Sequence, residues 1–339
     1  MIATNACFSC LQSQVDNLCA MLQMDSKTIQ QNIDSVLENT KGRGLMPPQI
    51  AIDVYESFRH STHLSDPFAE IKKESIAQAT KIVQSLLSTY PAPILEIGKD
   101  VDSKQNLESQ QKANCIVKSA CESFTLESPT ESTTNFSADS IFKRLNWAVR
   151  VAILGNVIDY GSQHSFDFAQ GDFSFHTINF ARFDLELFIS RLNSAQTLLY
   201  IADNAGENLF DEVLLQSLKS IYPHLQIFYA TRGEPIINDL TITDLAHPLA
   251  QNIQKYCTLL DSGVRSPGFV YAGANAQTRG IYDNADVILA KGMGNFECLN
   301  TQKDERLFLL FKVKCDVVAQ YCDVEKGRMM FIHNRTTKE

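Results

Sequence analysis

Apolar residues in the first part of the chain recur at three- or four-residue steps, which is the period of a helix with one buried face. Between residues 7 and 22 the pattern is carried by Phe8, Leu11, Val15, Leu18 and Leu22. Pro47-Pro48 and Asp66-Pro67 are typical helix starts, and apolar residues follow each of them at the same period. The N-terminal part of the chain is therefore predicted to be helical.

The second half of the chain has a different pattern, in which short apolar runs alternate with amphipathic stretches. The runs lie at residues 198–202, 226–230, 286–290 and 307–313. Their continuous apolar character is typical of buried parallel strands. Between the first two runs, residues 210–221 have helical spacing and stop before Pro223. The alternation predicts βα units, and hence a mainly parallel sheet covered by helices.

Between these halves lies a polar segment at about residues 100–140, rich in Ser, Thr, Asn, Gln, Glu and Lys, which predicts an exposed insertion or flexible loop. The apolar run 145–154 then predicts a buried helix that ends at Gly155-Asn156. We expect a helical N-terminal subdomain over residues 1–99, the polar insertion over 100–140, and an α/β core over 141–339.

Composition limits the partners and the location that we expect. The 339 residues are 44% hydrophobic, enough for a substantial core, and the net charge of -9 argues against a broad surface for nucleic acid or anionic membranes. The first residues show no secretory signal, and no apolar run approaches the roughly 20 residues that span a bilayer. Nine cysteines, an odd number, favour free thiols in a reducing cytoplasm.

Polar residues follow the predicted strands where a binding site is expected. Asp203-Asn204 comes directly after the first strand and Asp239 follows the second, while Lys291 and its glycine turn follow the third. Because the carboxyl ends of parallel strands meet at one edge of a sheet, the oxygens of Asp203, Asn204 and Asp239 are candidate ligands for a hard divalent cation. Lys291, Gly292 and Gly294 are candidates for anion binding.

Helix capping is a competing interpretation for the acidic residues, since Asp and Asn are favoured N-caps. Asp203 or Asn204 would cap the helix that begins near Gly206, and Asn238-Asp239 would begin another helix. Familiar nucleotide motifs do not fit the lysine-glycine turn. Glu297 stands where a dinucleotide fingerprint needs its third glycine, and the lysine precedes the glycines instead of following them as in a Walker loop.

Taken together, the motifs resemble the damage-control phosphatase family, catalogued as DUF89, in its prokaryotic-type branch. The resemblance rests on the order and spacing of Gly155-Asn156, 202–207, 233–239, Ser262-Gly263 with Pro267-Gly268, and 290–297, together with Cys7-Phe8-Ser9-Cys10, Asp66-Pro67-Phe68 and Lys314-Cys315. It implies a Rossmann-like α/β/α core with a helical N-terminal subdomain.

The same resemblance implies a divalent-metal-dependent phosphatase that acts on small phosphorylated metabolites. Asp203, Asn204 and Asp239 would hold Mg²⁺, Mn²⁺, Co²⁺ or Ni²⁺, and with Lys291 they would form the catalytic set. The substrate-binding residues are expected to be Asn156, Glu207, Ser262, Gly263, Lys291, Gly292, Gly294 and Asn295. No predicted strand ends in the Asp-x-Asp-x-Thr pattern of aspartyl-phosphate enzymes, which favours direct attack by water.

Two alternative functions stay open at this point. A Rossmann-like core also suits an S-adenosylmethionine-dependent carboxyl methyltransferase, although the glycine-rich loop expected for that cofactor is missing after residues 198–202. The other alternative is a non-catalytic thiol or metal sensor. Cys7 and Cys10 lie one helical turn apart, and Cys315 is a third candidate ligand for zinc or iron, but a closed zinc site needs four ligands.

Overall fold

The structure of the protein is a computed structural model that describes residues 1–24, 27–98, 136–157 and 178–334. Its α-helices are α1 (Asn5–Met21), α2 (Lys27–Thr40), α3 (Pro47–Thr62), α4 (Ala69–Thr89), α6 (Ala138–Leu154), α7 (Leu185–Leu192), α8 (Glu207–Ile221), α9 (Ala276–Asn284), α10 (Met293–Leu299) and α11 (Asp316–Cys322). Its strands are β1 (Phe180–Phe183), β2 (Thr197–Ile201), β3 (Gln226–Thr231), β4 (Thr258–Asp261), β5 (Val287–Lys291), β6 (Leu307–Lys312) and β7 (Met329–His333). Short 3₁₀ helices are η3 (Asp244–Ala246), η4 (Gln251–Lys255) and η5 (Tyr271–Gly273).

The helices predicted for the N-terminal part are present. α1 buries Leu11, Val15 and Leu18 on one face, and α3 begins at Pro47, where the ring supplies a helical φ and a missing N–H costs nothing. α4 begins two residues after Pro67. α2 lacks such a start signal and is an addition to the predicted set. Within the described part of the chain, no helix combines the length and the apolar character needed to cross a membrane.

The strands form one seven-stranded sheet in the order β1-β7-β6-β5-β2-β3-β4. The four strands predicted from apolar runs are β2, β3, β5 and β6, which pair in parallel with their neighbours in the middle of the sheet, while β7 runs antiparallel to β6. From β2 the chain proceeds to β3 and β4 on one side and then crosses to β5 on the other. The carboxyl ends of β2 and β5 therefore flank a topological switch point, where open α/β sheets bind their ligands.

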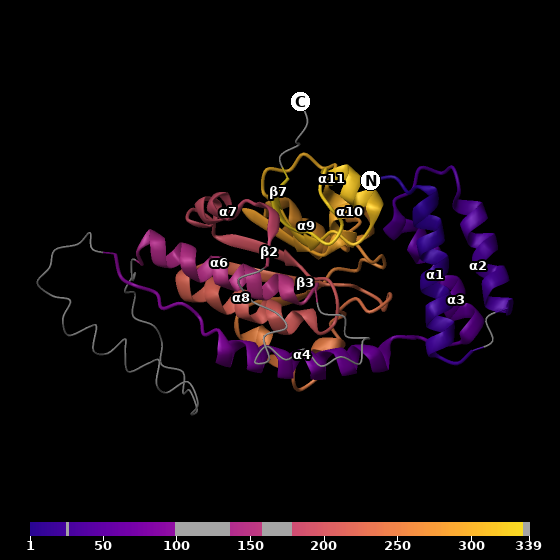
Figure 1. The fold of residues 1–339 in the computed structure, drawn as a ribbon, viewed down its shortest axis with the longest axis horizontal. Helices are drawn as coiled ribbons and strands as arrows, with labels where there is room; N and C mark the ends of the chain where they lie inside the picture. The colour runs from indigo at the N-terminus through magenta and orange to yellow at the C-terminus, as the bar shows by residue number, and fades with distance from the viewer. Residues whose placement is uncertain (25–26, 99–135, 158–177, 335–339) are drawn as a thin grey trace, which may run out of the picture.

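Alternation along the strands divides the core into two layers. Leu198 and Tyr200 of β2 pack with α4, α6, α7 and α8 on one face of the sheet. Leu199 and Ile201 pack on the opposite face with side chains of α9, α10 and α11. Figure 1 shows α6 and α8 side by side on one side of the sheet and the yellow helices α10 and α11 on the other side. This α/β/α arrangement confirms the predicted fold class.

The helices α1, α2 and α3 have a core of their own, beside the sheet (Figure 1). Ile236, from the loop after β3, is buried in that core, so this loop joins the helical unit to the sheet. α4 packs with α8 instead, whereas the predicted boundary at residue 99 groups it with the first three helices. Most of the predicted insertion at 100–140 lies outside the described residues, and α6 begins within its last residues, at Ala138.

Candidate functional site

The two residues after β2 are held by the backbone of the loop after β3. Leu240 N donates to Asp203 O at 2.8 Å, and Ala205 N donates to Asn238 O at 2.9 Å. These bonds place Asn204 opposite Asp239 in an isolated antiparallel bridge. The acid-amide pair and the second acid, which are far apart in the sequence, are thereby brought together as predicted.

Neither member of the pair caps a helix. The N-cap of α8 is Gly206, at φ +91°, and no side chain makes a capping hydrogen bond there. The helical element that follows Asp239 is the 3₁₀ helix η3, which begins at Asp244 and also lacks a side-chain cap. The competing capping interpretation is therefore wrong, and these side chains are left for another role.

Asp239 is completely buried. Its Oδ2 accepts a hydrogen bond from Arg232 Nε at 2.6 Å, whereas no described residue donates a hydrogen bond to its Oδ1. A buried carboxylate oxygen without a partner carries a desolvation cost unless something else satisfies it. Asp239 Oδ1 is thus a free oxygen ligand at the site.

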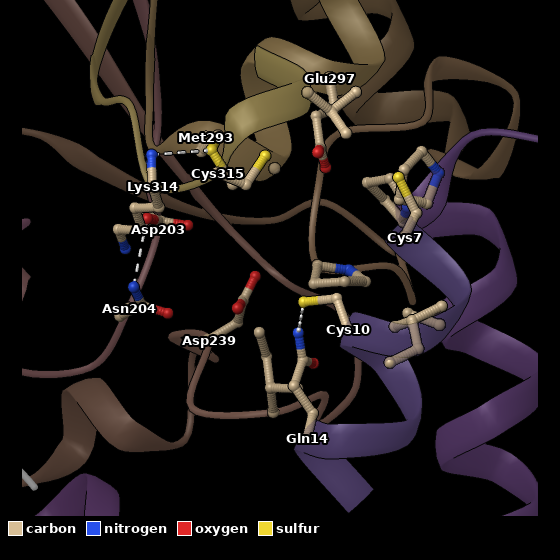
Figure 2. Close-up of a pocket in the computed structure, with 18 of the residues that line it drawn as sticks. Cys7, Cys10, Gln14, Asp203, Asn204, Asp239, Met293, Glu297, Lys314 and Cys315 are labelled. Carbon is tan, nitrogen blue, oxygen red and sulfur yellow. Dashed lines mark hydrogen bonds between the residues drawn. The ribbon is translucent and has the colours of Figure 1, made fainter. Parts of the chain in front are cut away.

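Two carboxamides converge on the carboxylates of Asp203 and Glu207. Asn204 Nδ2 donates to Asp203 Oδ2 at 3.2 Å and to Glu207 Oε1 at 2.8 Å. Asn156 Nδ2 donates to the same two atoms, at 3.2 and 2.9 Å. Because the N–H groups face the carboxylates, each amide oxygen points the other way. The Asn204 oxygen turns toward the side where Asp239 lies (Figure 2), and Asn156 Oδ1 is buried with no hydrogen-bond partner among the described residues.

Lys291, the residue predicted to contact the phosphate, does not line the pocket that contains Asp203, Asn204 and Asp239. Its side chain is 0% exposed, and Nζ lies 2.6 Å from Asp211 Oδ1 and 2.9 Å from Glu207 Oε2. The Tyr200 hydroxyl donates to the same Asp211 Oδ1 and the Tyr229 hydroxyl donates to Oδ2, each at 2.7 Å. Lys291 is the last residue of β5, and its inward direction sends the ammonium beneath α8, where it balances two buried carboxylates.

The absence of a side chain at Gly292 leaves room for the carboxylate of Asp203. A Cβ at this residue would lie 2.1 Å from Asp203 Oδ2, and the backbone has φ +93°, a conformation that L side chains rarely adopt. The glycine after β5 is therefore required because the carboxylate of Asp203 rests on its Cα. The anion-binding role that the sequence predicts for Gly292 stays a prediction.

Three other predicted substrate-binding residues have structural roles. Asn295 is buried, donates to Ala202 O and Lys291 O, and accepts from Phe269 N and Arg232. Ser262 Oγ accepts from Val264 N, and Gly263 packs against Gly233. None of the three lines the pocket described next, so their assignment as direct substrate contacts is not supported by the geometry.

Asp203, Asn204 and Asp239 line a pocket of about 460 Å³. One wall comes from α1 and from the start of α3, with Cys7, Cys10 and Gln14 facing the space (Figure 2). The opposite wall comes from the ends of β5 and β6 and includes Gly294, Glu297, Lys314 and Cys315. Cys7 and Cys10 were predicted to lie on the same side of a helix, and this is confirmed because both line the pocket.

The carboxylates of the site repel one another. Burial, followed by the charges of Glu207 and Asp239, raises the pKa of Asp203 well above its ordinary value. Burial likewise raises the pKa of Asp239 to about 6, although the Arg232 guanidinium opposes this. Lys314 acts on both carboxylates and lowers their pKa values. A positive charge added to this cluster would stabilise the ionised carboxylates.

The donor set suits a hard divalent cation. Asp203, Asn204 and Asp239 offer carboxylate and carboxamide oxygens, and within the described ranges Asp239 Oδ1 and Asn156 Oδ1 accept no hydrogen bond. No group of three or more His, Cys, Asp or Glu residues within the described ranges is arranged to hold a metal ion, which leaves the thiols without a metal cluster there. The proposed ligand set of Asp203, Asn204 and Asp239 is of a different kind, because one of its three members is an asparagine.

Sequence reasoning missed Lys314 as the cation of the pocket. It lies two residues beyond β6, at the same sheet edge as the predicted ligands, and its side chain is exposed to the pocket. The signal was available, because a lysine after a fourth parallel strand satisfies the same strand-end argument as Lys291. Sequence alone does not show which of the two lysines turns toward the ligand.

Fold and site together define an α/β protein with a mostly parallel seven-stranded sheet and an oxygen-rich pocket at its switch point. The family model described as the damage-control phosphatase ARMT1-like domain matches residues 3–330, and the chain belongs to this family. The DUF89 resemblance inferred from the motifs is confirmed.

Curated relatives carry the same family name. The chain is 34% identical over 194 residues to damage-control phosphatase PH1575 of Pyrococcus horikoshii, a match covering 56% of this chain and 64% of the relative. It is 33% identical over 187 residues to a damage-control phosphatase of Archaeoglobus fulgidus, covering 54% and 63%. The matches thus span slightly less than two thirds of these relatives.

A solved structure shares the fold over the whole chain. The crystal structure of a DUF89 family protein from Pyrococcus horikoshii superposes with a TM-score of 0.73 at 24% sequence identity, and the match covers 99% of this chain and 100% of that one. At this identity the comparison shows the fold alone.

Proposed function

We propose that this protein is a divalent-metal-dependent phosphatase that hydrolyses phosphate esters of small, and in part damaged, metabolites. The observation that carries the proposal is the convergence of Asp203, Asn204 and Asp239 on one pocket that also contains Lys314. The names of the relatives support a phosphatase. The oxygen donors support the metal.

In this proposal Asp203, Asn204 and Asp239 hold the cation. A divalent ion there would bind a phosphate oxygen and acidify a water molecule, as Mg²⁺ and Mn²⁺ do in other phosphoryl-transfer sites. The protein's own contribution is to fix the three ligand side chains. The backbone bonds between the β2 and β3 loops do this, together with the Glu207 carboxylate and the Gly292 contact.

Lys314 is the residue that we assign to the phosphate. It is the cation that lines the pocket among the described residues, and no ion pair engages its ammonium there. Its charge reaches Asp203 and Asp239, so a phosphate bound at the metal ligands lies within its range. The ammonium would offset charge on the transferred phosphoryl group.

The outer part of the pocket suits the remainder of a small substrate. Leu11, Pro47, Pro48 and Ala51 supply apolar surface, while Gln14 supplies an amide. A cavity of about 460 Å³ is in the range of small-molecule sites. A small phosphorylated metabolite fits a pocket that has charged residues at one end and both apolar and amide groups along its wall.

Metal removal and reloading tests the proposal. Chelator-treated protein, reloaded separately with Mg²⁺, Mn²⁺, Co²⁺ and Ni²⁺, would be assayed for phosphate release from sugar phosphates, phosphopantetheine and nucleotides. We expect release that is lost on chelation and restored by at least one ion. Release that is the same before and after chelation, or no release from any ester with any ion, would contradict the proposal.

A further inference from the structure

Glu297 is a buried residue whose carboxylate has no hydrogen-bond or ion-pair partner in the described part of the chain. It lies in α10 and is only 8% exposed. Its backbone carbonyl accepts from the Met1 amine at 2.8 Å and from Asn300 Nδ2 at 3.2 Å, but no hydrogen bond or ion pair to its side-chain oxygens exists among the described residues. The carboxylate points into the pocket (Figure 2).

The surroundings of Glu297 favour its neutral form. Burial raises its pKa to about 7, and the Met1 amine opposes this only in part. The other titratable groups that sense its charge are the thiols of Cys298 and Cys315. The same pocket is lined by Cys7, Cys10, Asp203, Asp239, Lys314 and Asp316. A carboxylic acid that is half protonated near neutral pH is suited to donate a proton.

The position of Glu297 relative to the proposed ligands would allow it to protonate the ester oxygen of a bound substrate. Asp203, Asn204 and Asp239 lie on one side of the pocket and Glu297 on another, with its oxygens directed toward the space between them (Figure 2). A phosphoryl group bound at the three ligands would direct its ester oxygen into that space. Alkoxides are poor leaving groups, so protonation of this ester oxygen should speed cleavage of its bond to phosphorus.

We infer that Glu297 is the general acid that protonates the leaving-group oxygen. Water adds its oxygen to phosphorus as the bond between phosphorus and the ester oxygen breaks. The Glu297 proton passes to that oxygen, giving the alcohol and H₂PO₄⁻, which retains both hydrogens of the water. Glu297 then regains a proton as the product loses one, so the net reaction is ester plus water to alcohol plus HPO₄²⁻. The inference rests on the proposed phosphatase function.

Leaving-group dependence tests this role. Glu297→Gln keeps the size of the side chain but has no acidic proton. With glycerol or sugar phosphates, whose alcohols need protonation, we expect kcat to fall by about 100-fold or more, in the range found for lost general acids. With 4-nitrophenyl phosphate, whose leaving group departs as an anion, we expect a loss of less than about fivefold, since the general-acid contribution does not apply.

Glu212→Gln is the control, because Glu212 is a partly buried glutamate whose pKa burial also raises to about 7, but it does not line the pocket. It should leave both activities unchanged. In the unsubstituted protein, activity on alkyl phosphates should fall as the pH rises through about 7, with no matching fall for the aryl ester. This second measurement does not depend on the folding of any variant.

Equal losses on both substrate types, or no loss on either, would overturn the role of Glu297, as would identical pH profiles for the two esters. These outcomes differ from failure of the proposed function. In that case the unsubstituted protein would hydrolyse neither ester with any of the four metals.

Discussion

Asn204 donates from Nδ2 to Glu207 Oε1 at 2.8 Å, and this bond decides which end of the carboxamide faces the pocket. With the N–H group committed to Glu207, the oxygen is turned toward Asp239. The other oxygen of Glu207 faces Lys291 at 2.9 Å, so the carboxylate is itself held in place. Glu207, which the sequence suggests as a substrate contact, therefore positions a proposed metal ligand.

Replacing this acceptor should weaken metal binding. In Glu207→Gln the oxygen that accepts from Asn156 and Asn204 loses its negative charge, and the new N–H group faces the Lys291 ammonium. We expect Mn²⁺ to bind about 10- to 100-fold more weakly, as when other supporting residues around metal ligands are changed. Calorimetric titration of the chelated protein measures this. Glu212→Gln, on the same helix, serves as the control, and equal affinities in the two variants would contradict the positioning role.

Lys291→Met should destabilise the protein. The substitution leaves Glu207 and Asp211 as buried charges without their cation, which costs about 3–5 kcal/mol of unfolding free energy in comparable cases. Urea unfolding measures the loss. Unchanged stability with only a higher KM would show instead that Lys291 binds the substrate.

Lys314→Met makes the complementary comparison. Its side chain is exposed, so its loss should change the unfolding free energy by less than about 0.5 kcal/mol. KM for phosphate esters should rise at least about tenfold if the ammonium meets the phosphate, which corresponds to about 1.4 kcal/mol. An unaltered KM would remove Lys314 from the phosphate site.

Gly292→Ala should displace Asp203, and Gly327→Ala provides a close control. Both glycines have a positive φ, +93° and +91°, which L side chains rarely adopt, so alanine meets backbone strain at both positions. Only at Gly292 does the added methyl meet a carboxylate, since nothing lies within 4 Å of the corresponding position at Gly327. We expect metal affinity to fall at least about tenfold in Gly292→Ala alone. Similar metal affinities in the two variants would show that the contact does not matter.

The burial of Glu212 should appear in the pH dependence of stability. Its pKa is raised from 4.5 to about 7, so the folded state holds a proton that the unfolded state releases between these values. Stability from this group is therefore lost as the pH rises through that window. Glu212→Gln should be more stable than the unsubstituted protein by about 1 kcal/mol at pH 8, allowing for partial exposure, and no more stable at pH 4. Urea unfolding at both pH values tests this, and a constant difference would contradict it.

Periodicity predicted the parts of the fold whose burial is continuous. The runs that became β2, β3, β5 and β6 lie in the middle of the sheet with helices on both faces, so nearly every residue is apolar. β1 and β4 were missed because they are edge strands of four residues that are only partly buried. β7 was missed because the prediction relied on the βα alternation of parallel strands, whereas β7 pairs antiparallel with β6.

The candidate site was predictable where strand ends alone decide the position, as for Asp203, Asn204 and Asp239. The roles of the lysines were not, because they depend on side-chain direction. Lys291 and Lys314 both follow parallel strands, yet one is buried beneath α8 and the other opens onto the pocket. Gly292 illustrates the same limit, since a glycine that accommodates a neighbouring carboxylate cannot be told by sequence from one that receives an anion.

The central claim is that Asp203 is a ligand of a catalytic metal, and Asp203→Ala tests it most directly. Mn²⁺ affinity by calorimetry and phosphate release would be measured on the same preparation, with circular dichroism to verify the fold. The account predicts a folded variant in which metal binding is weakened at least about 100-fold and metal-dependent phosphate release is abolished. A folded variant that binds the metal as before and retains full activity would contradict it.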